Sequence, residues 1–159
     1  DAVGMKHASL YYYVPGGKEQ LFIQTFEHSF ERHQQGIMQA IDAAGPMLRD
    51  QLYAIADWFV TQPAIAIDRI QHGDRPKISQ AEIGRLSTLA YNALRLPIVT
   101  ALQHAQSRDE IHIADFDLAA MAFISLIQST RNIPNTDEAT RQAIGYQLVD
   151  MILNGWRKR

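Results

Sequence analysis

Residues Gly4 to Phe22, GMKHASLYYYVPGGKEQLF, combine a short helix, a turn and the start of a second helix. The short helix carries small and polar residues and ends in three tyrosines, Tyr11 to Tyr13. Pro15-Gly16-Gly17 forms the turn, and Lys18 opens the next helix. This arrangement is typical of the second half of a helix-turn-helix that lies on DNA. Because the chain begins inside the motif, we expect the first half to lie upstream of Asp1.

The next segment, residues 18–44, has the pattern of one long amphipathic helix. Its apolar or partly apolar residues recur every three or four positions, as one buried helix face requires. This stripe consists of Phe22, Phe26, Phe30, His33, Ile37 and Ile41. Gly45-Pro46 ends the helix and starts another, since proline is tolerated in a first helical turn.

Helical periodicity continues through most of the remaining sequence, and no segment alternates for long in the manner of a strand. Pro63 should kink or end the second helix. Ser79-x-x-Glu82 is a capping box that starts a further helix, which Pro97 should kink or break. The predicted fold class is therefore all-α.

Two more helices are expected in the last third of the chain. Asp115 is a suitable N-cap for a helix that runs to about Arg131. A turn at residues 132–135 contains Pro134, and Thr136 is the predicted N-cap of the final helix.

Composition excludes several classes of protein. The 159 residues include no cysteine, which excludes disulfides and thiolate chemistry and fits a cytoplasmic protein. The net charge of −2 gives no overall attraction to nucleic acid, so any DNA binding must come from a local surface. The longest unbroken apolar run, Leu118 to Ile124, is too short to span a membrane.

The last two predicted helices carry more apolar surface than one core needs. Residues 118–127 are apolar at nine of ten positions, and the final helix has two apolar stripes. Two interpretations remain open: central core helices of a monomer, or a symmetric four-helix interface between two subunits. The candidate interface residues are Leu118, Met121, Ala122, Ile124, Tyr146, Val149 and Leu153.

The segment from Gly4 to Leu21 resembles the end of the DNA-binding domain of TetR/AcrR-family transcriptional regulators. In that family a recognition helix ends in Leu-Tyr-x-x-Phe, and Lys-Glu-x-Leu opens a long connecting helix. Leu10-Tyr11-Tyr12-Tyr13-Val14 and Lys18-Glu19-Gln20-Leu21 match this pattern, except that Val14 replaces the usual phenylalanine. The turn between them is one residue longer than the common form.

The resemblance implies a division into three parts. Residues 1–17 would be the remnant of the helix-turn-helix domain, 18–44 the connecting helix, and 45–159 a ligand-binding and dimerisation domain. The implied function is a ligand-responsive DNA-binding transcriptional regulator: a homodimeric repressor released from its double-stranded DNA operator by a small, partly apolar effector. The alternative is a helical small-molecule-binding or dimerisation module that does not itself bind DNA.

Candidate DNA contacts follow from the chemistry of the motif. Base edges are read by donors on a recognition helix, for which Lys6, His7 and Ser9 are the candidates. Tyr11 and Tyr12 can donate hydroxyls to phosphates. Lys18 adds a charge where the free N–H groups of a helix N-terminus already favour an anion.

An effector pocket is expected among the middle helices. The candidate lining residues are Trp58, Phe59, Gln62, Leu86, Tyr91, Leu94, Leu102 and His104, although each apolar one also fits a plain core. Asp57 and Asn92 are further polar candidates, since a buried polar group without a partner is costly unless a ligand satisfies it.

Catalytic and metal motifs are not found in the sequence. Six histidines are present, but no HExxH, phosphate loop, dinucleotide fingerprint or nucleophile elbow occurs. Glu27, His28 and Glu31 are interpreted as a solvated helix face. We therefore expect a protein that is not an enzyme and that needs no metal and no cofactor.

Overall fold

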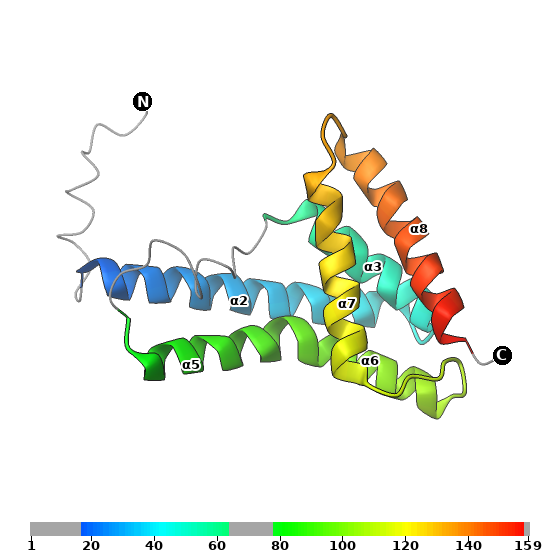
Figure 1. The fold of residues 1–159 in the computed structure, drawn as a ribbon, viewed down its shortest axis with the longest axis horizontal. Coiled ribbons are helices and arrows are strands. Elements are labelled where there is room, and N and C mark those ends of the chain that lie inside the picture. The colour runs from blue at the N-terminus through cyan, green and yellow to red at the C-terminus, as the bar shows by residue number, and fades with distance from the viewer. Residues whose placement is uncertain (1–16, 64–77, 158–159) are drawn as a thin grey trace.

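The computed structural model describes residues 17–63 and 78–157, and this part of the chain contains helices and no strand. Figure 1 shows α2 and the α5–α6 segment side by side, with α7 crossing them and α3 and α8 packed behind and beside it. The elements in chain order are α2 (Gly17–Ala44), α3 (Leu48–Thr61), α5 (Gln80–Ala90), η1 (Tyr91–Arg95), α6 (Leu96–Ser107), α7 (Phe116–Ser129), η2 (Thr130–Asn132) and α8 (Glu138–Trp156). The predicted all-α fold class is confirmed.

The long helix α2 has the predicted extent and the predicted buried face. Phe26, Phe30, His33 and Ile37 all lie on its buried side. The ring centroids of Phe26 and Phe30 are 5.9 Å apart, so the aromatic part of the stripe is continuous. Gly45 ends the helix with a φ of +81°, a conformation that glycine adopts without strain.

The N-terminus of α3 is held by a distant segment. The backbone N–H of Leu48 donates to the Glu110 carboxylate at 3.2 Å, because Met47 at the N-cap offers no side-chain acceptor. A guanidinium N–H of Arg108 donates to the Pro46 carbonyl at 2.7 Å. The connection between α6 and α7 therefore supplies the cap that the sequence next to α3 lacks. The negative charge of the Glu110 carboxylate is favourable at a helix N-terminus.

The expected kink or break at Pro97 is absent, because the irregularity lies one turn earlier. In the π-helical turn η1, the N–H of Leu96 donates to the Tyr91 carbonyl, five residues back. Arg95 and Leu96 keep right-handed helical dihedrals, so helical backbone continues from Gln80 to Ser107. The extra residue places Pro97 in the first turn of α6, so the helix continues despite its missing N–H.

Two predicted N-caps are confirmed and one is off by a residue. The Ser79 hydroxyl accepts from the Glu82 N–H, and the Asp115 carboxylate accepts from the Leu118 N–H. The cap of α8 is not Thr136 but Asp137, whose carboxylate accepts from the Thr140 N–H at 2.8 Å. An ionised acceptor at a helix N-terminus is favoured over a hydroxyl by the helix dipole.

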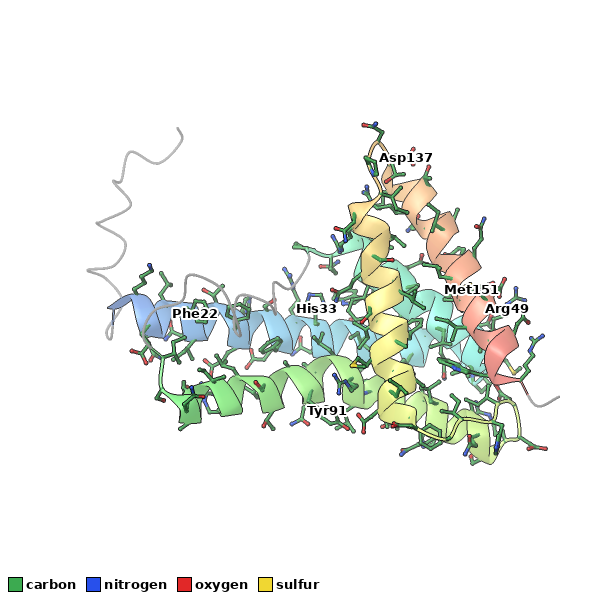
Figure 2. The ribbon with its side chains drawn as sticks, viewed as in Figure 1. Phe22, His33, Arg49, Tyr91, Asp137 and Met151 are labelled. Atoms are coloured by element: carbon green, nitrogen blue, oxygen red, sulfur yellow. The ribbon has the colours of Figure 1, made fainter. Side chains whose placement is uncertain are left out.

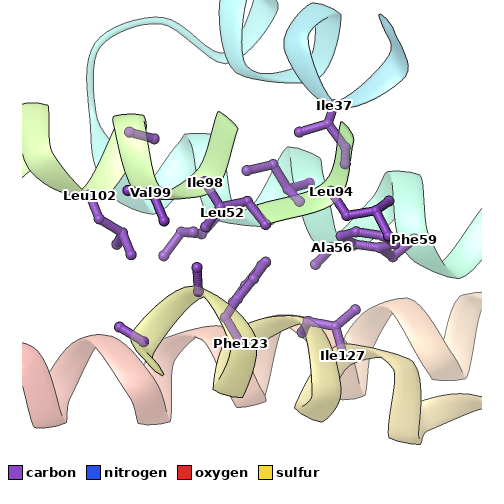
Figure 3. Close-up of a cluster of buried hydrophobic side chains, with 14 of the residues drawn as sticks. Ile37, Leu52, Ala56, Phe59, Leu94, Ile98, Val99, Leu102, Phe123 and Ile127 are labelled. Carbon is purple, nitrogen blue, oxygen red and sulfur yellow. The ribbon is translucent and has the colours of Figure 1, made fainter. Parts of the chain in front are cut away.

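The core lies where α3 meets α2, α6, α7 and α8 (Figure 3). Its fully buried side chains interdigitate from several helices, among them Ile37, Leu52, Ile98, Leu102, Phe123 and Ile127. At the end of α3, the guanidinium of Arg131 donates to the carbonyls of Phe59 and Gln62, two acceptors that the helix itself leaves open. None of the described helices has the length and hydropathy that crossing a bilayer would need.

Candidate functional site

A groove of about 580 Å³ lies between α2 and the η1–α6 segment. This volume is within the range of pockets that hold small organic molecules. The α2 side is formed by Gln34, Met38, Ile41, Asp42 and Gly45, with Gln51 from α3 beside them. The opposite side is formed by Asn92, Leu96, Pro97, Thr100, Ala101 and His104.

Polar and apolar groups are separated along this groove. The helices α2 and α5–α6 run in the same direction (Figure 1), so residues early in both lie at one end of the groove. Gln34 and Asn92 belong to that end, and Asp42 and His104 belong to the other. At 1.5 Å per helical residue, Gln34 and Asp42 are roughly 12 Å apart along α2. Apolar groups, including the half-exposed Met38, occupy the length between them.

Among the described residues, the groove lining has one carboxylate and no lysine or arginine. Asp42 is exposed, and within the described ranges it forms no ion pair. The nearby arginines are used elsewhere: Arg49 pairs with Asp150 at 2.9 Å, and Arg108 pairs with Glu110. The site therefore offers, beside His104, a carboxylate that no described lysine or arginine neutralises.

A buried histidine of α2, labelled in Figure 2, joins this helix to α3. His33 is 2% exposed, and its Nδ1 accepts from the Trp58 indole N–H at 3.2 Å. Because Nδ1 accepts, the ring proton sits on Nε2, which is buried. The Trp58 ring covers Gly36 so closely that a Cβ there would lie 2.0 Å from it. We call His33, Gly36 and Trp58 the His33 junction.

Burial keeps His33 neutral. It lowers the pKa of His33 to about 4, with smaller contributions in the same direction from the positive charges of Arg32 and Arg131. A hydrogen bond with the backbone of Pro63 acts in the opposite direction and raises the pKa of His33. An imidazole at this position therefore acts as a hydrogen-bond acceptor for Trp58 throughout the neutral pH range.

Of the eight pocket residues predicted from the sequence, His104 lines the groove, as does the further polar candidate Asn92. Phe59, Leu86, Leu94 and Leu102 lie in the core with 3% exposure or less. Trp58 packs on Gly36, Tyr91 lies under the Arg95 guanidinium, and the Gln62 carbonyl accepts from Arg131. Sequence reasoning missed Met38, Asp42 and Leu96, and the position of Ile41 on the helical stripe was the one signal that pointed to this side of α2.

The candidate DNA contacts fall mostly outside the described residues. Lys6, His7, Ser9, Tyr11 and Tyr12 belong to the segment before Gly17, which the structure does not describe. Lys18 lies in the first turn of α2 with its side chain exposed. These six assignments stay predictions.

The candidate interface residues divide into an outward and an inward set. Leu118 and Met121 are 56% and 43% exposed on α7, and Ala122 and Ile124 are partly exposed beside them. Val149 and Leu153 face the core of the chain itself, at 0% and 5% exposure.

Tyr146 also takes part in a contact within the subunit. Its hydroxyl donates to Asp57 Oδ2 at 2.6 Å, and this hydrogen bond, together with burial, raises the pKa of Tyr146 to about 12. Its ring packs on Tyr53 with the centroids 4.5 Å apart. Met151, 57% exposed on α8, is an outward apolar residue that was not among the seven.

Similarity to known proteins is visible in structure and not in sequence. The sequence gives no significant match to any protein-family model or to any curated protein. A solved structure, a bacterial regulatory protein in the TetR family from Rhodococcus RHA1, is similar with a TM-score of 0.63 at 17% sequence identity. The similarity covers 98% of this chain and 82% of that chain. The chain therefore has an all-α, TetR-like fold.

Proposed function

We propose that this protein is a ligand-responsive DNA-binding transcriptional regulator, a homodimeric repressor that a small, partly apolar effector releases from its operator. The observation that carries the proposal is the course of α2. This single helix begins at Gly17 with Lys18 exposed in its first turn, and its second half forms one wall of the groove. The TetR-like fold supports the same assignment.

The length of α2 allows the two ends to communicate. Lys18 and Asp42 are separated by 24 residues, which corresponds to roughly 36 Å of continuous helix. An occupant of the groove that pushed α2 away from α6 would also shift Lys18, since a packed helix moves largely as one body. The Glu27 carboxylate holds α2 to α5 between these points through its ion pair with Arg85, at 2.6 Å.

Lys18→Ala is expected to weaken binding to all operator sequences alike, because a phosphate contact carries no sequence information. The slope of log affinity against log salt should become less steep by about one per subunit. Fluorescence anisotropy of the natural full-length protein with its own promoter DNA, over a range of salt concentrations, measures both effects.

Arg157→Ala is the matched control, because it removes a positive charge from an exposed residue at the opposite end of the described chain. An unchanged salt slope for Lys18→Ala would contradict the phosphate contact. Tyr11→Phe should have the same effect as Lys18→Ala, a similar loss of affinity for all operators. Changes at Lys6 or Ser9 should instead alter which operator sequence is preferred.

The subunit interface is proposed for the exposed apolar face formed by Leu118, Met121 and Met151. Leu118→Glu combined with Met121→Glu should convert a dimer into a monomer, because two buried carboxylates per subunit would lose their hydration without gaining partners. Analytical ultracentrifugation measures the outcome. Met47→Glu, at another apolar residue that is 54% exposed, is the control that should stay dimeric. A double variant that remains dimeric would place the interface elsewhere.

A further inference from the structure

We propose that the groove between α2 and α6 binds an elongated organic amine, with its protonated amino group at Asp42 and a hydrogen-bond donor at the Asn92 end. The regulatory meaning of this site rests on the proposed function, whereas binding itself does not. The inference follows from the order of charge, apolar surface and backbone acceptors along the groove.

The charge of the groove favours a positively charged ligand. Within residues 17–63 and 78–157, Asp42 is the one carboxylate of the lining, and no lysine or arginine there could receive an anion. An anionic ligand would meet Asp42 at one end with no compensating charge, whereas an ammonium group would gain a charge-assisted hydrogen bond. Gln51 is already engaged there, because its amide donates to the Gly45 carbonyl at 2.7 Å.

The middle of the groove selects an apolar body. Met38 and Leu96, on opposite walls, are 50% and 42% exposed, although leucine and methionine are ordinarily among the buried residues. A hydrocarbon segment placed between them would remove apolar surface from water on both walls, which is favourable by about 25 cal/mol per Å². Gln34 and Asp42, the polar residues at the two ends of the α2 wall, are roughly 12 Å apart, and this separation sets the approximate length of the ligand.

The π-helical turn favours a ligand with a hydrogen-bond donor at the other end of the groove. The N–H of Leu96, four residues after Asn92, donates to Tyr91, and Pro97, five residues after Asn92, has no N–H. Neither position of the helical register therefore supplies a donor to the Asn92 carbonyl, which leaves this backbone acceptor open to water or to a ligand. Asn92 lines the groove, so a ligand hydroxyl or amine can reach this residue.

A matched pair of probes tests the charge. Isothermal titration calorimetry should show that 8-aminooctan-1-ol binds and that 8-hydroxyoctanoate, of similar length but opposite charge, does not. Asp42→Asn should weaken binding of the amine up to about fivefold, since an exposed ion pair contributes up to about 1 kcal/mol. Glu31→Gln removes a carboxylate from an exposed residue of the same helix that does not line the groove, so it should leave the affinity unchanged.

A second variant tests the location. Thr100 is an exposed residue of the groove wall, so Thr100→Phe should fill the groove and abolish binding while the protein stays folded. Equal binding of the carboxylate probe, or an unchanged affinity in Asp42→Asn, would overturn the inference. A third outcome separates this site from the proposed function. If Asp42→Asn weakens amine binding but the amine does not change operator affinity, the site is supported and the effector response is contradicted.

Discussion

Gly36→Ala is expected to lower the free energy of unfolding by about 1–3 kcal/mol, the usual effect of inserting a methyl group into a packed interface. The new Cβ would lie 2.0 Å from the Trp58 ring, so the indole must move. That movement would also break its hydrogen bond to His33. The loss exceeds the gain of up to about 1 kcal/mol that alanine ordinarily gives over glycine inside a helix. Urea unfolding followed by circular dichroism measures the difference.

The same substitution at a second helical glycine provides the control. Gly84 in α5 has open space where a Cβ would stand, so Gly84→Ala should stabilise the protein by up to about 1 kcal/mol. In a Trp58→Ala background, Gly36→Ala should also become stabilising, because the ring that it meets is gone. Destabilisation that persists without Trp58 would show that the His33 junction is not the cause.

The stability of the protein is expected to fall by about 3 kcal/mol between pH 7 and pH 4 because of His33 alone. Its pKa is about 4 in the folded protein and 6.5 for an ordinary histidine, so between these values the unfolded chain binds a proton that the folded protein does not. Stability from this residue is therefore complete above pH 6.5 and is lost as the pH falls toward 4. The difference of about 2.5 pKa units corresponds to the stated energy.

His33→Gln should remove this part of the pH dependence. Chemical unfolding of both proteins at pH 7 and pH 4 isolates it, since carboxylates such as Asp150, whose pKa is lowered mainly by its hydrogen bond with Arg49, contribute equally to both. His28→Gln, at an exposed residue of the same helix, should keep the wild-type pH dependence. Identical acid sensitivity in wild type and His33→Gln would refute the assignment.

The sequence predicted those helices and helix starts that are determined by residues close together in the chain. The stripe from Phe22 to Ile41 predicted α2, and the acceptor side chains of Ser79 and Asp115 predicted two helix starts. His33 was placed on the buried stripe, but its role was not visible. That role depends on Trp58, which is 25 residues away in the sequence.

The remaining features depend on backbone register or on tertiary packing. Nothing in the side chains of residues 91–95 signals the π-helical turn that accommodates Pro97. Likewise, the cap of α3 comes from Glu110, 62 residues away. The apolar periodicity of α8 could not separate inward Val149 from outward Met151, because both belong to apolar stripes and only packing on α3 distinguishes them.

The groove was the least predictable part of the candidate site. Its floor and walls join α2 to a helix that begins more than 30 residues later, and its charge depends on which arginines are already paired. From a sequence pattern, an apolar residue is expected to be buried in the core. This expectation holds for Phe59, Leu86, Leu94 and Leu102. Met38 and Leu96 are apolar but exposed, and their exposure can be recognised only from the packing of the helices in three dimensions.

The central claim is that this helical body serves a DNA-binding unit through α2. The most direct measurement is the affinity of the natural full-length protein for its own promoter region and for unrelated DNA of equal length, at several salt concentrations. The account predicts tighter binding to the promoter and a steep loss of affinity as salt rises, because phosphate contacts release counterions. Equal affinity for both DNAs, or no binding at low salt, would contradict it and favour a helical ligand-binding or dimerisation module that does not bind DNA.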